Sequence, residues 1–166
     1  MQTKEGWGAM KPIEVFASRF GSKISFNPEF VIEKGQRYYL LNPRLKSMLQ
    51  GDFYYAGLYL GKVKNGIFFP SFNLLNMLVN VAANKVVVDR KVAWLFICGR
   101  DVFRTGILKV MGSKRKGDAT LVLNEFGECL GFGKIIDGID GSEGKVAVKN
   151  ILDVGDFLRR ETKSKF

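Results

Sequence analysis

The second half of the chain is a series of short apolar segments separated by turns that contain glycine. The segments are residues 85–89, 93–97, 106–110, 119–123, 129–136 and 145–149. Short strands at regular spacing, with turn residues between them, are typical of a small closed or partly closed β-barrel. The pattern therefore predicts a mostly β region over residues 91–166.

Residues 1–90 have a different pattern, in which helix-like and strand-like segments alternate. Apolar residues at helical spacing predict a helix over residues 11–21, with Pro12 in its first turn and Gly21 as its stop. Residues 31–41 are strand-like with a break at Lys34-Gly35, and a short helix follows from Asn42-Pro43 to Gly51. This half of the chain therefore reads as α+β.

A β-hairpin is the strongest local signal in this first half. Strand-like residues 53–63 and 67–69 flank Lys64-Asn65-Gly66, and Asn-Gly between two such runs favours a tight hairpin turn. From Ser71 to Asn84 the sequence predicts a helix capped by Ser71, with apolar residues on nearly every face. We expect that helix to be largely buried.

Near Arg90 the sequence changes from mixed helix-like and strand-like segments to mostly strand-like ones. This change suggests two domains, residues 1–90 and residues 91–166. No linker rich in Pro, Gly or Ser separates them, so we expect a tight interface between the two.

Several classes of activity are disfavoured by what the sequence lacks. It has no histidine, which removes the usual general base and the commonest metal ligand. Its two cysteines, Cys98 and Cys129, lie in apolar runs, which favours buried, reduced thiols in an intracellular protein. Gly57 to Val63 is one residue short of a phosphate loop, Gly112 to Asp118 has its glycine spacing but aspartate in place of the lysine, and Gly131-Phe-Gly133 lacks the helix that follows a dinucleotide loop. We expect no cofactor, no metal, no membrane span and no catalysis.

The charge balance points to a polyanionic partner. The chain has 26 basic and 16 acidic residues, giving a net charge of +10, and both halves are basic. Lys114, Arg115 and Lys116 lie between two glycines on a turn that phosphates could reach, although such turns are also often merely solvated. Arg100 and Arg104 bracket a short helical turn and could add to the same surface.

A second basic cluster lies near the C-terminus. At helical spacing, Arg159, Arg160 and Lys163 fall within an arc of about 100°, opposite residues 157–158. One face of this helix would dock against the rest of the protein, and the other would present a stripe of cations. The alternative is an ordinary solvated face with an ion pair between Asp156 and Arg160.

Aromatic residues could supply base-stacking surfaces in the first half of the chain. Candidates are residues 53–55, Tyr59 and residues 68–69, although alternation assigns most of them to the core. Tyr38 and Tyr39 are neighbours on one strand, so we expect one of them to face outward.

Two stretches carry a family resemblance. Residues 117–133, ending in Leu-Gly-Phe-Gly, and residues 153–160, Asp-Val-Gly-Asp-Phe-Leu-Arg-Arg, resemble a PUA domain, the RNA-binding barrel named after pseudouridine synthases and archaeosine transglycosylases. Together with the α+β region of about ninety residues that precedes them, these two stretches are similar to the archaeal form of the Nip-seven family of large-subunit ribosome biogenesis factors.

This resemblance implies an α+β fold with an N-terminal antiparallel sheet and helices, followed by a small PUA-type barrel. It implies a non-catalytic protein that binds single-stranded or irregular pre-ribosomal RNA, works beside other assembly factors, and is cytoplasmic, or nucleolar in a eukaryote. RNA contact is implied at Arg159, Arg160 and Lys163, and we extend the cluster to Lys165. The alternative is an RNA-modifying enzyme of the pseudouridine synthase or methyltransferase class, or its RNA-binding accessory subunit.

Overall fold

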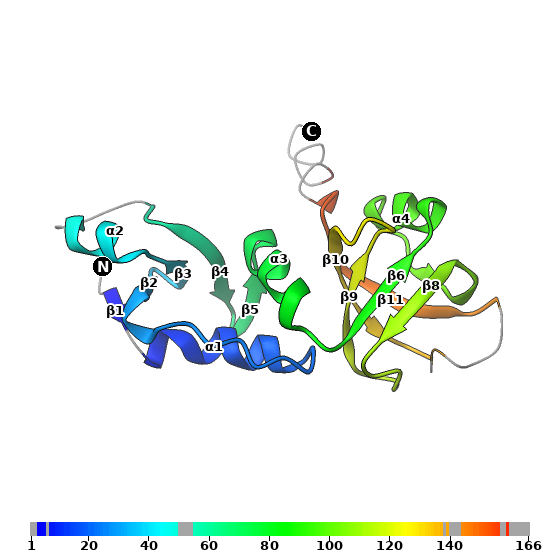
Figure 1. The fold of residues 1–166 in the computed structure, drawn as a ribbon, viewed down its shortest axis with the longest axis horizontal. Helices are drawn as coiled ribbons and strands as arrows, with labels where there is room; N and C mark the ends of the chain where they lie inside the picture. The colour runs from blue at the N-terminus through cyan, green and yellow to red at the C-terminus, as the bar shows by residue number, and fades with distance from the viewer. Residues whose placement is uncertain are drawn as a thin grey trace. The chain divides into compact units, whose positions relative to one another are not determined.

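The computed structural model describes residues 3–5, 7–49, 55–137, 139, 144–156 and 159. The chain forms two compact units (Figure 1). The first contains Met1–Ser18 and Lys23–Val81, and the second contains Arg19–Ser22 and Ala82–Phe166. Within the described residues, no helix combines the length and apolar character needed to cross a bilayer.

In the first unit the described residues form a five-stranded antiparallel sheet and three α-helices. Its elements are β1 (Thr3–Glu5), α1 (Trp7–Ser18), η1 (Pro28–Phe30), β2 (Val31–Lys34), β3 (Arg37–Leu40), α2 (Pro43–Met48), β4 (Leu58–Lys64), β5 (Ile67–Pro70) and α3 (Phe72–Val81). The strands follow one another in the order β1-β2-β3-β4-β5. Each strand therefore pairs with its neighbour in the sequence.

Two tight turns set the register of this sheet. Asn65 and Gly66 have φ of 51° and 74°, and Gly35 and Gln36 have φ of 56° and 63°. Two successive residues with positive φ are the signature of the type I′ turn, whose twist matches that of paired strands. The hairpin expected at Asn65-Gly66 is confirmed, and the break at Lys34-Gly35 is a second hairpin of the same kind.

The helices of the first unit begin where capping side chains favour it. The side chain of Asn42 accepts a hydrogen bond from the Leu45 amide at 2.7 Å, and the Ser71 hydroxyl accepts one from the Leu74 amide at 3.2 Å. Both expected helices are confirmed, but α3 buries only one face, since Val81 is 50% exposed. Helix α1 begins at Trp7, so Pro12 lies inside it and not in its first turn.

Tyr38 and Tyr39 point to opposite faces of the sheet, and both are buried. Tyr38 packs against Phe68, which contacts Phe16 of α1, with ring centroids 5.8 and 5.5 Å apart. Tyr39 lies in a cluster with Ile32 on the other face, beside residues of α2. The expectation that one tyrosine is exposed was wrong, because both faces are covered at this point.

The described residues of the second unit form a six-stranded, curled sheet covered by an α-helix. Its elements are β6 (Lys85–Val88), α4 (Arg90–Ile97), β7 (Val102–Phe103), η2 (Arg104–Gly106), β8 (Ile107–Met111), β9 (Ala119–Leu123), β10 (Cys129–Ile135) and β11 (Val146–Asp153). The strand order is β7-β11-β10-β9-β6-β8, with only β6 and β9 parallel among these neighbours. The core contains Val86, Val88, Phe96, Val102, Val122, Ile135, Ile139, Ala147 and Val148. The expected α+β class with a small barrel is confirmed.

One expected strand is a helix. Residues 93–97 belong to α4, whose first turn is capped by Asp89, with a carboxylate oxygen 2.8 Å from the Val92 amide. Val92, Ala93 and Phe96 turn inward at helical spacing while Trp94 is 65% exposed. The run of apolar residues alone did not show that its side chains repeat at helical spacing. Cys98, at the end of α4, is exposed and not buried as expected.

A short segment from far earlier in the sequence completes the second unit. Phe20 is fully buried and its ring meets Phe132 of β10 edge-on, with centroids 5.6 Å apart. Its carbonyl accepts hydrogen bonds from the Ala83 and Asn84 amides at 3.1 and 3.0 Å. A domain boundary near residue 90 stays a prediction; by its contacts, the second unit includes β6, which pairs with β8 and β9.

Candidate nucleic-acid interface

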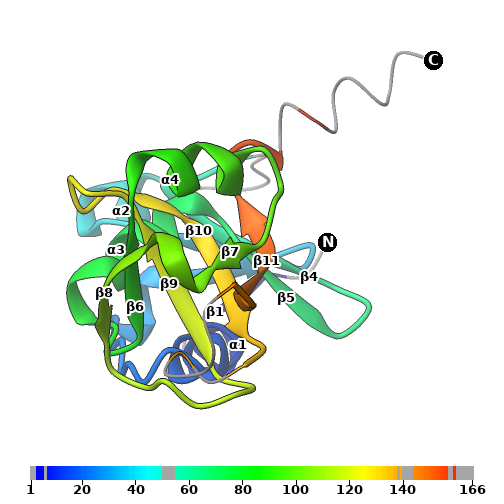
Figure 2. The same cartoon turned by 90° about the vertical axis from the view of Figure 1, so that its right-hand side faces the viewer.

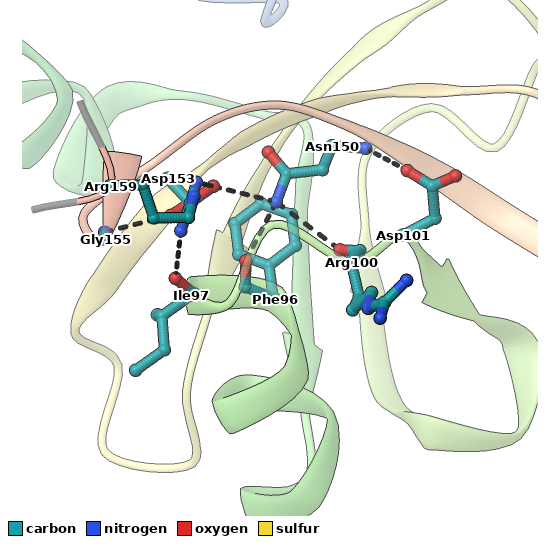
Figure 3. A network of polar contacts seen from close by, with 8 residues as sticks. All are labelled: Phe96, Ile97, Arg100, Asp101, Asn150, Asp153, Gly155 and Arg159. Atoms are coloured by element: carbon teal, nitrogen blue, oxygen red, sulfur yellow. Dashed lines mark hydrogen bonds and ion pairs between the residues drawn. The ribbon is translucent and has the colours of Figure 1, made fainter. Parts of the chain in front are cut away.

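Arg159 links the last residue of β11 to the end of α4 through an ion pair and a hydrogen bond. The Arg159 guanidinium donates to the Asp153 carboxylate, with Nη2 and Oδ2 2.6 Å apart, and through Nη1 to the carbonyl oxygen of Ile97 (Figure 3). Asp153 is only 2% exposed. Since the last carbonyls of a helix lack partners within it, Arg159 satisfies one of them and complements the helix dipole.

Asn150 extends this network to the loop that follows α4. Its side-chain amide donates to the Phe96 carbonyl at 2.9 Å and to the Asp153 carboxylate at 3.1 Å, and its backbone amide donates to Asp101 at 2.8 Å (Figure 3). The other oxygen of Asp153 accepts from the Gly155 amide at 2.9 Å. These contacts fix the start of the C-terminal segment to the barrel.

Arg159 therefore has a structural contact that the helical-wheel argument did not include. The hydrogen bond to Asp153 raises the pKa of Arg159 above its ordinary value. Its side chain is still 37% exposed, and a role in RNA binding stays a prediction. Arg160, Lys163, Lys165 and residues 157–158 lie outside the described residues.

The loop between β8 and β9 carries the other predicted basic cluster, and a buried asparagine holds it in place. Asn84 is 6% exposed; its side chain accepts from the Ser113 amide at 2.9 Å and donates to the Ala119 carbonyl at 3.2 Å. Gly112, just before, has φ of 77°, and a Cβ there would lie 2.5 Å from the Ala83 carbonyl oxygen. Only glycine fits at that position without strain.

Lys114, Arg115 and Lys116 are all exposed on this loop. The Arg115 side chain is 86% exposed and lies 3.6 Å from the Asp118 carboxylate, so it has a solvated ion pair of small energetic value. The Gly117 amide donates to the Ile135 carbonyl at 2.8 Å, which ties the loop to β10. The loop therefore presents its cations on a fixed backbone.

The two basic clusters are not brought together. The loop of residues 112–118 lies at the end of the second unit opposite α4 (Figures 1 and 2). Arg100, which is exposed, lies at the α4 end, and its carbonyl accepts from Asn150 at 3.4 Å. Arg104 begins η2 and is partly buried, with an Nη1 atom that has no hydrogen-bond partner among the described residues.

Some exposed residues that could contact a polyanion were missed by sequence reasoning. Lys134 and Lys149 are opposite each other on β10 and β11, and both are exposed. The outer face of α4 carries Arg90, Lys91 and the exposed Trp94. Correct assignment of α4 as a helix, signalled by the Asp89 cap, would have placed these three side chains on one face.

Residues 84–162 match a family model described as the UPF0113 PUA domain. A protein of Archaeoglobus fulgidus named UPF0113 protein is 30% identical over 112 residues, which is 65% of this chain. The match spans 63% of the length of that relative.

Solved structures share the fold over almost the whole chain. A conserved PUA domain protein from Thermoplasma acidophilum has a TM-score of 0.63 and 23% identity, covering 96% of this chain and 99% of that one. A PUA domain protein from Aeropyrum pernix has a TM-score of 0.61 and 18% identity, covering 98% and 91%. Both units of this chain therefore have counterparts in known folds.

Proposed function

We propose that this protein is a non-catalytic RNA-binding factor in large ribosomal subunit biogenesis, of the Nip-seven type, and binds pre-ribosomal RNA through its second unit. The observation that carries the proposal is the match of residues 84–162 to a PUA domain in a chain of net charge +10. Phosphate contacts supply most of the sequence-independent affinity for nucleic acid, and a basic barrel can provide them.

The α4 end of the barrel is the main binding site in this proposal. Arg159 is held there by Asp153, at the end of the barrel that also carries Arg100. Arg160, Lys163 and Lys165 follow closely in the sequence, and we assign RNA contact to them as well. Trp94, 65% exposed on α4, offers a ring on which a base can stack. The loop cations Lys114, Arg115 and Lys116 form a second, separate contact.

A barrel with this arrangement favours single-stranded or irregular RNA over duplex DNA. Unpaired bases can stack on its exposed ring and phosphates can contact its cations, and no element has to enter the groove of a duplex. Filter binding with matched oligonucleotides tests this preference. Equal or tighter affinity for duplex DNA of the same length would contradict it.

Two triple variants locate the site. Each phosphate contact to a single strand contributes about 0.7 to the slope of log affinity against log salt, so replacing Arg160, Lys163 and Lys165 by alanine should reduce that slope by about 2. Replacing Lys114, Arg115 and Lys116 removes the same charge from the loop between β8 and β9. If only the loop variant shows a reduced slope of log affinity against log salt, the main RNA-binding site lies on the loop.

The biological role and the absence of catalysis need separate tests. Crosslinking in cells followed by sequencing of the bound RNA should recover pre-ribosomal RNA; recovery of tRNA would oppose the biogenesis role. Incubation with ribosomal RNA and tRNA, with S-adenosylmethionine or ATP, should yield no modified nucleoside by mass spectrometry. One new modified nucleoside would establish the enzyme alternative.

A further inference from the structure

One face of the first sheet carries a row of cations that the PUA unit does not explain. The cross-strand register places Lys34 opposite Arg37, Arg37 opposite Lys62, and Lys62 opposite Phe69. Residues directly opposite in antiparallel strands share a face, so this row runs across β2, β3, β4 and β5. Lys64, opposite Ile67, lies on the same face one step along the hairpin.

This face is turned away from α1. Phe68, which alternates with Ile67 and Phe69 along β5, packs against Phe16 of α1 on the other face. Arg37, Lys62 and Lys64 are exposed, and so are Ile67 and Phe69, at 57% and 41%. The cations and the apolar side chains are therefore accessible together.

A cluster of tyrosine rings continues the same face. Tyr39 and Tyr59 are opposite each other, with ring centroids 5.6 Å apart, and Tyr55 leans on both at 5.6 and 6.3 Å. Arg37 lies two residues before Tyr39 on β3 and therefore on the same face, and its positive charge opposes the rise in the pKa of Tyr59 that burial causes. Tyr55 is 65% exposed although two rings support it.

Strands β2 to β5 carry no acidic residue on this face. Within strands β2 to β5, Glu33 is the one acidic residue, and it is opposite Tyr38 on the α1 face, where it hydrogen-bonds the phenol. Like charges directly opposite each other on paired strands destabilise a sheet. Arg37 and Lys62 in direct opposition are therefore a cost to folding that an anion on this face would relieve.

We propose that the face of the first sheet formed by Arg37, Lys62, Lys64, Tyr55 and Phe69 is a second binding surface for single-stranded RNA. Phosphates contact the three cations, and bases stack on the exposed faces of Tyr55 and Phe69. The inference rests on the proposed function, because RNA is the polyanion assigned there. Exposed rings among the cations favour RNA over an acidic protein segment, since every base has a π-face that can stack.

The test uses the full chain and a single-stranded RNA long enough to reach both units. Lys62→Gln with Lys64→Gln should reduce the slope of log affinity against log salt by about 1.4, and lower the affinity about tenfold near 150 mM salt. Lys11→Gln with Lys23→Gln is the matched control, because both lysines are exposed and neither lies on the sheet. The control should keep the wild-type slope.

Phe69→Leu tests stacking without a change of charge. It should weaken binding about fivefold or more while leaving the salt slope unchanged. RNA substituted with 5-bromouridine should crosslink to peptides that contain Tyr55 or Phe69. Urea unfolding of each variant confirms that the fold is retained.

The outcomes separate this inference from the proposed function. If the wild-type protein binds no RNA, the proposed function fails, and the second surface fails with it. If the wild-type protein binds RNA but the Lys62/Lys64 variant behaves like its control, this inference alone is overturned; a face that serves an acidic protein would give that result.

Discussion

Asp153 is buried to 98% of its surface and holds the guanidinium of Arg159 at 2.6 Å. The carboxylate is satisfied on both oxygens, by Arg159 and Asn150 on one and by Gly155 on the other. A buried charge without such partners would be strongly destabilising. The contact therefore fixes Arg159 to the barrel.

Replacing Arg159 by glutamine should lower the free energy of unfolding by about 1–2 kcal/mol, because the lost hydrogen bonds join charged groups but the arginine is partly solvated. Urea denaturation measures the change. Arg100→Gln, a substitution of an exposed side chain near the same network, should cost less than about 0.5 kcal/mol. Equal losses in the two variants would contradict the structural role of Arg159. A loss of about 0.7 in the salt slope of RNA binding by Arg159→Gln would show that it also contacts a phosphate.

Two glycines of the basic loop should respond differently to alanine. Gly112 and Gly117 have φ of 77° and 98°, but a Cβ at Gly117 meets nothing within 4 Å, whereas one at Gly112 meets backbone. We expect Gly117→Ala to cost about 1–2 kcal/mol from the backbone conformation alone. Gly112→Ala adds an overpacking cost of about 1–3 kcal/mol. Thermal or urea unfolding that ranks the two variants in the opposite order would refute the close approach.

Tyr38 should make the protein sensitive to alkali. Burial, together with the charge and hydrogen bond of Glu33, raises the pKa of Tyr38 to about 12. Below the ordinary value of 10 the phenol is protonated whether the chain is folded or not, so its contribution to stability is constant there. Between pH 10 and 12 the unfolded chain loses that proton and the folded one keeps it, so stability falls as pH rises, by up to about 1.4 kcal/mol per unit.

Tyr38→Phe removes this pH-dependent contribution to the free energy of unfolding. The difference in unfolding free energy between wild type and variant should be constant up to about pH 10 and then shift in favour of the variant. A difference that stays flat to pH 12 would mean that Tyr38 ionises as an exposed tyrosine does.

The two thiols should differ in reactivity. Cys98 is exposed, whereas burial raises the pKa of Cys129 to about 11, so little thiolate forms there near neutral pH. A disulfide reagent at pH 8 should modify one thiol rapidly, and Cys98→Ser should abolish the rapid phase. A rapid phase that survives this substitution would assign it to Cys129.

Local signals in the sequence were enough for much of the fold. The Asn65-Gly66 turn and the Asn42 and Ser71 caps are set by residues within a few positions of one another, and each structure formed where expected. Helix α4 was missed because its apolar run of residues 92–97 resembles a strand when the Asp89 cap is overlooked.

The candidate site was harder to predict because its contacts join distant parts of the chain. Arg159 reaches a carbonyl 62 residues earlier, and the loop cations depend on Asn84, 29 residues before Ser113. The row of Arg37 and Lys62 follows from strand register, including an irregularity next to Tyr38 that no composition or spacing rule indicates. Helical spacing described only the C-terminal segment itself, and gave no sign that Arg159 binds a buried carboxylate.

The place of Phe20 in the second unit has a consequence for how these parts can be inherited. The ring that packs edge-on against Phe132 is encoded between β1 and β2 of the first sheet, whereas the strands of the barrel and α4 are encoded after that sheet. A gene fragment beginning at codon 82 would yield a barrel with a hole where Phe20 belongs. Exon shuffling or fusion at that point would therefore damage the transferred module, and selection should keep the sheet and the barrel together as one heritable unit.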